Sequence, residues 1–387
     1  MLVARSHLLK TSVAPVAARA VAVPPPAVAA PSPDLVGGNK VTLLVDEQNA
    51  LPQLEQALEG AQSLIDVAMF SFLPTGSGVE IANILKAKAQ AGLEVNVEID
   101  DIGSLQIPFS QRVRFFKDLE RAGVHVLHNP AERQPVDHRK VYVIDNKTSF
   151  VGGMNLGKGY DIWHDSMLKM DGPVTARAAA EFVGRWRAHG GAVTDLQQQL
   201  IDHPSAAVGS ANVTLLENAP GSAQAITDYY LSQLATAKTR VWMQSPVISS
   251  ELFANAMMAA ARRGVDVRLA VTGTTSTNTP LGLPLISRSF YPELIKAGVK
   301  VFEQQRMSHA KMLISDDLVT IGSLNLTNRS ATHDFEVNAV VDDSTTLTGA
   351  VAEFNDDVAH AKLISDADLH TRLDESLAIA RRAHVQY

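Results

Sequence analysis

Two copies of one polar pattern hold the residues of this chain that are best suited to chemistry. The first copy consists of His138, Lys140, Asp145 and the run Gly152-Gly153-Met154-Asn155. The second copy consists of His309, Lys311, Asp316 and the run Gly322-Ser323-Leu324-Asn325. Both fit the template H-x-K-x4-D followed by G-[GS]-x-N. Imidazole, ammonium and amide groups in this combination are suited to binding and transferring a phosphoryl group.

The spacing within each copy predicts that the histidine and the lysine share one face. The segment after each lysine is strand-like, and residues i and i+2 of a strand face the same side. We therefore expect Lys140 to point with His138 and Lys311 to point with His309. One histidine could attack phosphorus, while the other protonates the leaving alcohol and then deprotonates the incoming one.

The remaining residues of the pattern have expected supporting roles. The amides of Asn155 and Asn325, together with the two lysines, would neutralise non-bridging oxygens as charge builds in the transition state. Small residues at Gly153 and Ser323 would let backbone or substrate approach closely, so we expect all four residues to bind substrate.

Four acids fall into two classes by their spacing. Asp165 lies 27 residues after the histidine of the first copy, and Glu336 lies 27 residues after the histidine of the second. An imidazole needs a partner that fixes its tautomer, and the equal offset nominates these two acids as orienting groups. Asp145 and Asp316 lie at strand ends that lead into hairpin turns, which indicates a structural role.

The histidines could instead belong to a metal site. A lysine beside each histidine would repel a cation, and the chain has no His-x-x-His or His-Glu-x-x-His pattern. We therefore expect no metal and no cofactor, and we find neither a P-loop nor a dinucleotide fingerprint. The other histidines that we considered are expected to be ordinary polar residues, namely His125, His128, His164 and His333. Trp163 and Trp186 are expected to be packing groups.

The elements that must position this chemistry also occur twice. A strand at 65–70, a helix at 81–91 and a strand at 93–99 are matched by segments at 240–244, 252–263 and 265–271. Glycine ends both helices, at Gly92 and Gly264. The pattern predicts two homologous α/β/α sandwich domains related by a pseudo-two-fold axis, at residues 35–205 and 206–387. We expect a largely parallel sheet covered on both faces, a seam near 203–206 and a final helix at 366–384.

The composition bounds the classes of protein to which this chain can belong. Its 387 residues are 46% hydrophobic and 19% charged, with no cysteine and a net charge of −7. The chain can therefore bury a large core, and it has no disulfide or thiolate chemistry. The net charge argues against nucleic-acid binding by bulk electrostatics. No apolar stretch outside the N-terminal tail reaches the 18 residues typical of a transmembrane helix.

Residues 1–34 differ in composition from the rest of the chain. They contain 6 of the 18 prolines, three basic residues and one acid. A secretory signal with a cleavage site at Ala27-Val28-Ala29 is one interpretation, but Arg19 and Pro24-Pro25-Pro26 interrupt the apolar core that such a signal needs. We favour a flexible Ala/Pro-rich tail over an export signal.

Over residues 40–365 the sequence resembles the phospholipase D superfamily, and most closely its bacterial cardiolipin synthase branch. The residues that carry the likeness are Asp137-His138-Arg139-Lys140, Phe150 to Asn155, Trp163-His164-Asp165 with Gly172-Pro173-Val174, Tyr291 to Leu294 with Ala297 to Val299, and Asn325 to Asn338. The resemblance implies a phospholipase D fold, a site shared by two α/β domains, a phosphohistidine intermediate and no metal. It also implies that His138 is the nucleophile, that His309 is the acid/base, and that Asp165 and Glu336 each orient the histidine of the opposite half.

Two departures from the family pattern are visible. Segment 245–247 reads Ser-Pro-Val where the branch often has a Thr-Pro-Tyr-type sequence. The N-terminal transmembrane helices that are frequent in the branch are also missing.

The resemblance favours a phospholipid phosphodiesterase or phosphatidyltransferase that uses water or an alcohol as acceptor. We expect a monomer, either soluble or peripherally bound to a membrane, in the bacterial cytoplasm rather than exported. A nuclease or another phosphodiesterase of the superfamily is the alternative, against which the net charge of −7 weighs. A non-catalytic binding module is disfavoured because both halves retain every residue of the pattern.

Overall fold

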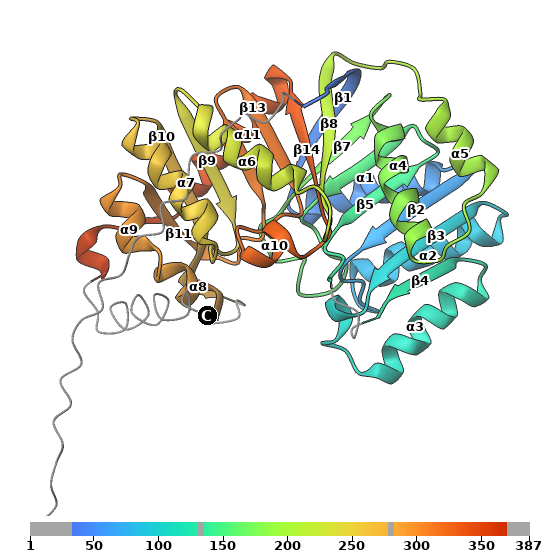
Figure 1. Cartoon of the computed structure of the whole chain (residues 1–387). Coiled ribbons are helices and arrows are strands. Elements are labelled where there is room, and N and C mark those ends of the chain that lie inside the picture. Colours follow the sequence, from blue (N-terminus) through green and yellow to red (C-terminus); the bar gives the residue numbers. More distant parts are fainter. Residues whose placement is uncertain (1–32, 131–134, 278–281, 370–387) are drawn as a thin grey trace, which may run out of the picture.

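The computed structural model describes residues 33–130, 135–277 and 282–369 (Figure 1). Residues 1–32 of the predicted tail and residues 370–384 of the predicted final helix lie outside the described residues. The first half of the chain contains β1 (Val36–Val45), α1 (Glu47–Gly60), β2 (Leu64–Met69), α2 (Ser77–Gln90), β3 (Glu94–Asp100), η1 (Ile102–Ser104), α3 (Phe109–Arg121), β4 (His125–Asn129), β5 (Lys140–Ile144), β6 (Thr148–Gly152), β7 (Ser166–Asp171), α4 (Thr175–Ala188) and α5 (Asp195–Asp202).

The second half repeats this order with small additions. It contains β8 (Ala211–Asn218), α6 (Ala225–Thr236), β9 (Arg240–Ser245), α7 (Glu251–Arg262), β10 (Asp266–Thr277), α8 (Gly282–Arg288), α9 (Tyr291–Lys296), β11 (Lys300–Arg306), β12 (Met312–Ser315), β13 (Leu318–Gly322), α10 (Asn328–Thr332), β14 (Glu336–Asp342), α11 (Ser344–Ala359), β15 (Lys362–Leu363) and η2 (Asp366–Leu369). None of the helices in the described ranges is long and apolar enough to cross a bilayer.

One sheet of fifteen strands runs through the described part of both halves. Its order is β15-β11-β10-β9-β12-β13-β14-β8-β1-β7-β6-β5-β2-β3-β4. Read outward from the centre, the two halves have the same strand order, which is the pseudo-two-fold arrangement predicted from the repeat. The halves meet where β1 and β8 pair antiparallel, with Val36 opposite Val213 and Asn39 opposite Ala211.

The expectation of a largely parallel sheet is wrong. Only β2-β3-β4 and β9-β10-β11 run parallel, while β5, β6, β7 and β1 pair antiparallel, as do β12, β13, β14 and β8. The physical reason is the length of the connections. A parallel pair needs a crossover of a dozen or more residues, whereas β5 and β6 are joined by a short hairpin.

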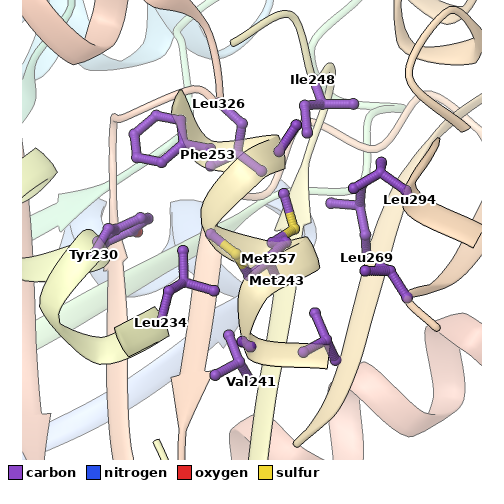
Figure 2. Close-up of a cluster of buried hydrophobic side chains, with 14 of the residues drawn as sticks. Tyr230, Leu234, Val241, Met243, Ile248, Phe253, Met257, Leu269, Leu294 and Leu326 are labelled. Carbon is purple, nitrogen blue, oxygen red and sulfur yellow. The ribbon is translucent and has the colours of Figure 1, made fainter. Parts of the chain in front are cut away.

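Helices cover both faces of the sheet in each half. Helices α6, α7 and α9 enclose one core cluster with Tyr230, Phe253, Met257 and Leu294 (Figure 2). The corresponding helices α1, α2 and α3 enclose a second cluster against the first half of the sheet. Helices α4 and α11 pack against a third cluster that contains strand residues from both halves. Because this cluster is shared, the packing of each half depends on the other.

The helix ends and the turn acids follow the sequence prediction. Gly92 and Gly264 follow α2 and α7 with φ of +94° and +93°, values that suit glycine best. Asp145 adopts φ +51° in the β5–β6 hairpin, and its carboxylate accepts hydrogen bonds from the backbone of Gln62, Ser63 and Leu64 at 2.8, 2.8 and 3.0 Å. Asp316 makes the equivalent bonds to the segment that leads into β9. Asp145 therefore fixes the start of β2, and Asp316 fixes the start of β9. Both of these strands end beside the polar pattern of their own half.

We expect Asp145→Ala to lower the free energy of unfolding by about 2–3 kcal/mol, because it leaves N–H groups without an acceptor and disfavours the positive φ. Urea unfolding followed by circular dichroism would measure this change. Asp317→Ala is the control, since that side chain is 91% exposed and should change the free energy by less than about 0.5 kcal/mol. Equal stability of the two variants would contradict the role of Asp145.

Candidate active site

The two histidines lie at equivalent ends of the two halves of the sheet. Lys140 is the first residue of β5 and is paired with Met69, the last residue of β2. Lys311 immediately precedes β12, whose first residue, Met312, is paired with Gln244 near the end of β9. Both polar patterns therefore begin at the carboxyl ends of parallel strands, where ligand sites of α/β sheets are commonly found.

Short backbone bridges join each histidine to the opposite half. The N–H of His138 donates to the carbonyl of Phe335 at 2.9 Å, and the N–H of His309 donates to the carbonyl of His164 at 2.6 Å. Phe335 and His164 each come directly before an acid of the predicted orienting pair. These backbone hydrogen bonds thus place each carboxylate next to the histidine of the other half.

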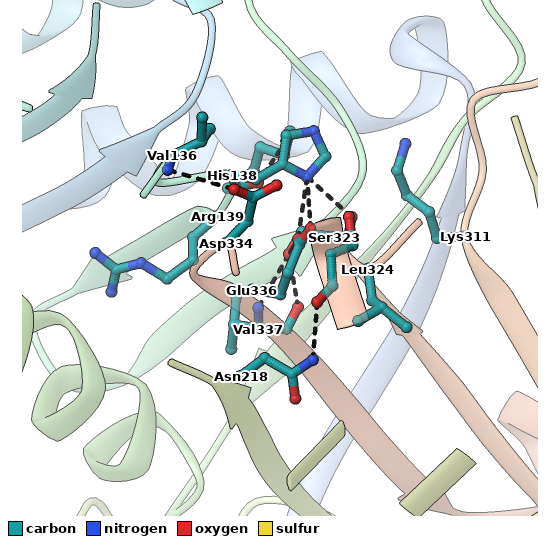
Figure 3. Close-up of polar contacts among 12 residues, drawn as sticks. Val136, His138, Arg139, Asn218, Lys311, Ser323, Leu324, Asp334, Glu336 and Val337 are labelled. Carbon is teal, nitrogen blue, oxygen red and sulfur yellow. Dashed lines mark hydrogen bonds and ion pairs between the residues drawn. The ribbon is translucent and has the colours of Figure 1, made fainter. Parts of the chain in front are cut away.

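Both acids contact the imidazole Nδ1 across the junction of the halves. For His138, Nδ1 lies 3.0 and 3.2 Å from the two carboxylate oxygens of Glu336 (Figure 3). For His309, Nδ1 lies 2.6 Å from Oδ2 of Asp165. A proton held on Nδ1 by a carboxylate leaves Nε2 as the nitrogen that can react. All four residues are less than a tenth exposed.

The lysines are buried beside the histidines. Nζ of Lys140 donates to the carbonyl of His138 at 2.5 Å, and Nζ of Lys311 donates to the carbonyl of His309. Lys140 is 0% and Lys311 is 1% exposed. Their ammonium groups therefore share one buried region with the two imidazoles, where interactions between charges are strong.

Burial and mutual repulsion lower the pKa values of these cationic groups. Burial and then the charge of Lys311 lower the pKa of His309 to about 3, against the opposing effect of Asp165. Burial also lowers the pKa of His138, which the Glu336 carboxylate opposes. Burial and the charge of Lys311 lower the pKa of Lys140 to about 7, and burial lowers that of Lys311 to about 8. These shifts favour neutral imidazoles at neutral pH, and a bound anion would favour their protonated forms.

Gly153 and Ser323 contact the orienting acids. A Cβ atom on Gly153 would lie 2.2 Å from Oδ1 of Asp165, so only glycine fits beside this carboxylate. At the matching position, the hydroxyl of Ser323 donates to Glu336, and its carbonyl oxygen lies 3.1 Å from Nδ1 of His138. These contacts indicate that the two residues position the carboxylates, whereas the sequence suggested contact with substrate.

The two asparagines lie in different surroundings. Asn325 lines a cavity of about 440 Å³ together with His138, Phe70 and Arg329. Asn155 instead lines a small cavity against α1. Both side-chain oxygens are buried without a hydrogen-bond partner. Asn325 is therefore placed to meet a ligand at His138, while the expected contact of Asn155 with substrate stays a prediction.

Sequence reasoning missed a buried ionic network behind His138. The guanidinium of Arg139 donates to Asp137 at 2.6 and 2.8 Å and to Glu98 at 3.0 Å, and it also contacts Glu181. The second half has Ala310 at the equivalent position. Asp137 lies two residues before Arg139, whereas Glu98 and Glu181 come from β3 and α4, far away in sequence, so no spacing rule could have found those two.

A second missed network lies behind His309. The imidazole of His164 is 2.8 Å from Asp46 on one side and 2.8 Å from Asp357 on the other, and Arg306 pairs with Asp46 at 3.0 Å. Burial lowers the pKa of His164, but hydrogen bonds to Asp357 and Asp46 outweigh burial and raise it to about 9. This imidazole links residues of both halves directly behind Asp165.

Trp163 belongs to the site, contrary to our expectation of a packing group. Its ring centroid lies 5.0 Å from that of His309 and 4.7 Å from that of Tyr160. Trp186 is buried and stacks on Phe182, as expected. The position of Trp163 two residues before Asp165 was the available signal in the sequence.

Comparisons with known proteins agree with this geometry. The sequence model of a family described as "Cardiolipin synthase, PLD-like domain" matches residues 54–186 and 230–358. The probable cardiolipin synthase YwiE of Bacillus subtilis is 27% identical over 352 residues, which cover 86% of this chain and 69% of that protein. The cardiolipin synthase of Halalkalibacterium halodurans is 30% identical over 342 residues, which cover 83% of this chain and 66% of that protein. The chain thus spans about two thirds of the length of these relatives.

Solved structures share the fold at low sequence identity. The phosphatidylserine synthase of Haemophilus influenzae Rd KW20 superposes with a TM-score of 0.73 at 14% identity, covering 91% of this chain and 94% of that chain. The polyphosphate kinase of Porphyromonas gingivalis has a TM-score of 0.59 at 14% identity, covering 90% of this chain and 53% of that chain. At this identity the likeness shows the fold alone.

We expect Gly153→Ala to lower turnover of a small phosphodiester, such as bis(p-nitrophenyl) phosphate, by about 100-fold, because the added methyl group must displace the carboxylate that holds His309. Steady-state kinetics would measure this. Gly184→Ala is the matched control, since nothing lies within 4 Å of a Cβ atom there. Similar kinetics for both variants would rule out the positioning role of Gly153.

Anion binding should be coupled to proton uptake. A bound oxyanion favours the protonated lysines and raises their pKa values from about 7 and 8, so its affinity falls as pH rises through that range. Calorimetric titration with tungstate at pH 8, in buffers of different ionisation enthalpy, would measure the uptake. Lys140→Met should reduce it, whereas the exposed Lys362→Met should not. Binding without proton uptake would show that both lysines are already charged in the empty site.

Proposed function

The chain belongs to the cardiolipin synthase family of phospholipase D-like domains, and we propose that it transfers a phosphatidyl group between alcohols through a covalent phosphohistidine intermediate. The family match confirms the resemblance noted in the sequence. The observation that carries the proposal is the reciprocal pairing of each histidine with a carboxylate of the opposite half. This pairing gives two reactive nitrogens in a single site.

In the first half-reaction, Nε2 of His138 attacks the phosphorus of a donor phospholipid. A phosphorus–nitrogen bond forms while the bond from phosphorus to the head-group oxygen breaks. His309 donates a proton to the departing alkoxide, so the head group leaves as a neutral alcohol. The donor phosphodiester is an anion, and its charge favours the protonated form of His309 that this step requires.

In the second half-reaction, the acceptor alcohol replaces the first. His309, now neutral, takes the proton of the acceptor hydroxyl as its oxygen attacks the phosphohistidine. The phosphorus–nitrogen bond breaks, and His138 returns to its starting state. With a hydroxyl of phosphatidylglycerol as acceptor the product is cardiolipin, and with water it is phosphatidic acid.

Lys140, Lys311 and Asn325 supply electrostatic stabilisation. Their donors lie around the histidines and can pair with the non-bridging oxygens, on which charge accumulates in the transition state. The lysines are already desolvated, so little reorganisation is needed when that charge develops. Asp165 and Glu336 hold the imidazoles in place through Nδ1.

We propose further that a single copy of the chain is active and that it works at a membrane surface. Both histidines and both acids come from one chain, so a second copy is not needed to complete the site. The substrate that we propose resides in a bilayer, which implies peripheral association. The net charge of −7 weighs against nucleic acid as the substrate.

The decisive experiment is a product assay on mixed vesicles of phosphatidylglycerol and phosphatidylcholine, with a metal chelator present throughout. We expect cardiolipin or phosphatidic acid from the wild type, and a loss of at least about 1,000-fold for His138→Ala and His309→Ala. His360→Ala is the matched control, because its side chain is 76% exposed and distant in sequence from the pattern. The ratio of the two products distinguishes a transferase from a hydrolase.

The same assay can contradict the proposal in two ways. Absence of both products from an otherwise folded wild type would remove the lipid assignment. Full activity of either histidine variant would remove the two-histidine mechanism. Trapping a radiolabelled, acid-labile phosphoprotein that His138→Ala does not form would identify the attacking histidine.

A further inference from the structure

The geometry points to a docking surface for a phospholipid bilayer, formed by Leu105, Phe109 and Ile162, which we call the apolar rim. These side chains are 56%, 71% and 54% exposed. They lie on two segments, one between η1 and the start of α3, the other in the loop that leads into β7. The inference rests on the proposed function, because it names the surface through which the same site reaches its lipid.

The two segments meet at one cavity. Side chains from both line a volume of about 690 Å³, among them Ile107, Ile162, Trp163 and Lys158. Nε2 of Gln106 donates to the hydroxyl of Tyr160 at 2.5 Å, which ties the two segments together. Ile162 of the rim belongs to this lining, and Leu105 and Phe109 lie next to its Gln106 and Ile107 in sequence, so exposed apolar residues adjoin a partly apolar cavity.

The cavity adjoins the candidate active site at Trp163. Trp163 lines it, and the ring of Trp163 lies 5.0 Å from the ring of His309. A phosphodiester held between the histidines would therefore have this cavity beside it. A cavity of this size matches the range that accommodates a ligand larger than a head group.

The chemistry of the surroundings favours a lipid over a protein or a nucleic acid. Tryptophan and tyrosine are enriched at the depth of lipid head groups, where Trp163 and Tyr160 would lie if the rim were inserted. Lys158 is the charged residue of the cavity lining, and it would meet the phosphates of anionic lipids. A strongly basic track, which a nucleic acid would require, is not formed by these residues.

The second half places a matching feature on the same end of the sheet. Helix α8 follows β10 as η1 follows β3, and its Ile286 is 45% exposed. Figure 1 shows α8 and α3 on either side of α10, along the lower edge of the molecule. Apolar residues from both halves thus lie toward the carboxyl ends of the parallel strands, where the histidines also lie, so one bilayer could contact both.

The test is flotation of the full chain with vesicles of phosphatidylglycerol and phosphatidylcholine. We expect Leu105→Glu/Phe109→Glu to reduce the vesicle-bound fraction at least tenfold, with an unchanged melting temperature. The matched control is Val208→Glu/Leu363→Glu, which changes two apolar residues elsewhere that are 57% and 55% exposed. Equal binding of the two double variants would overturn the proposal.

Fluorescence provides a second readout that does not depend on the substitutions in the rim. Trp186 and Trp242 are 4% and 7% exposed, whereas Trp163 is half-buried at the cavity. Lipids brominated on the acyl chains should quench the wild type, and Trp163→Phe should remove that quenching. Quenching that persists in Trp163→Phe would place the membrane contact elsewhere and overturn the proposal.

The outcomes separate this inference from the proposed function. Vesicle binding that depends on the rim, without any lipid product, would support the docking surface and remove the proposed reaction. Lipid products that are unaffected by the rim substitutions would support the proposed reaction and contradict the docking surface. A wild-type dimer that Leu105→Glu/Phe109→Glu dissociates in sedimentation analysis would identify the rim as a contact between copies and overturn the bilayer assignment.

Discussion

Two lysines and two histidines are buried together at the junction of the halves, and the free-energy cost of placing positive charge in this buried group is the constraint on which the structure depends. Carboxylates from the opposite half offset this cost, at distances of 3.0 Å or less. Such pairing tolerates little displacement, so the halves must be held in a fixed relation. The β1–β8 pairing, the backbone bridges at His138 and His309 and the hydrophobic cluster shared by α4 and α11 provide that relation.

The same electrostatics make the site selective for anions. Because the pKa values of Lys140, Lys311 and His309 are lowered, the pocket carries less positive charge than two lysines and two histidines could. A bound phosphodiester anion would favour protonation and restore that charge. The side of the site near His309 opens past Trp163 toward apolar residues, whereas the side near His138 opens toward Asn325 and Arg329. Two cavities on the two sides of one histidine pair suit a reaction in which two alcohols occupy the site in turn.

The repeat made much of this arrangement predictable. Equal offsets in both halves identified Asp165 and Glu336 before any contact was known, and the glycine that ends each helix marked the units of the fold. The antiparallel pairing of half of the strands could not be read in this way, because hydrophobic patterns reveal strands but not their neighbours. Most contacts of Arg139 and His164 were also hidden, since Glu98, Glu181, Asp46 and Asp357 lie 40 or more residues away from them in the chain. The sequence singled out Gly153 for its small size. Only the structure shows why glycine is needed there, because a Cβ atom would lie 2.2 Å from the Asp165 carboxylate.

The exchange of carboxylates between the halves has a consequence for how such a chain can diverge. In an assembly of two identical copies, every substitution would appear on both sides of the axis at once. Covalent fusion removes that symmetry and lets the two sides accumulate separate changes. Here one side has Gly153 with Asp165 and Arg139, and the other has Ser323 with Glu336 and Ala310. The two imidazoles consequently have unequal surroundings. Duplication within one chain thus allows two equivalent histidines to take different roles.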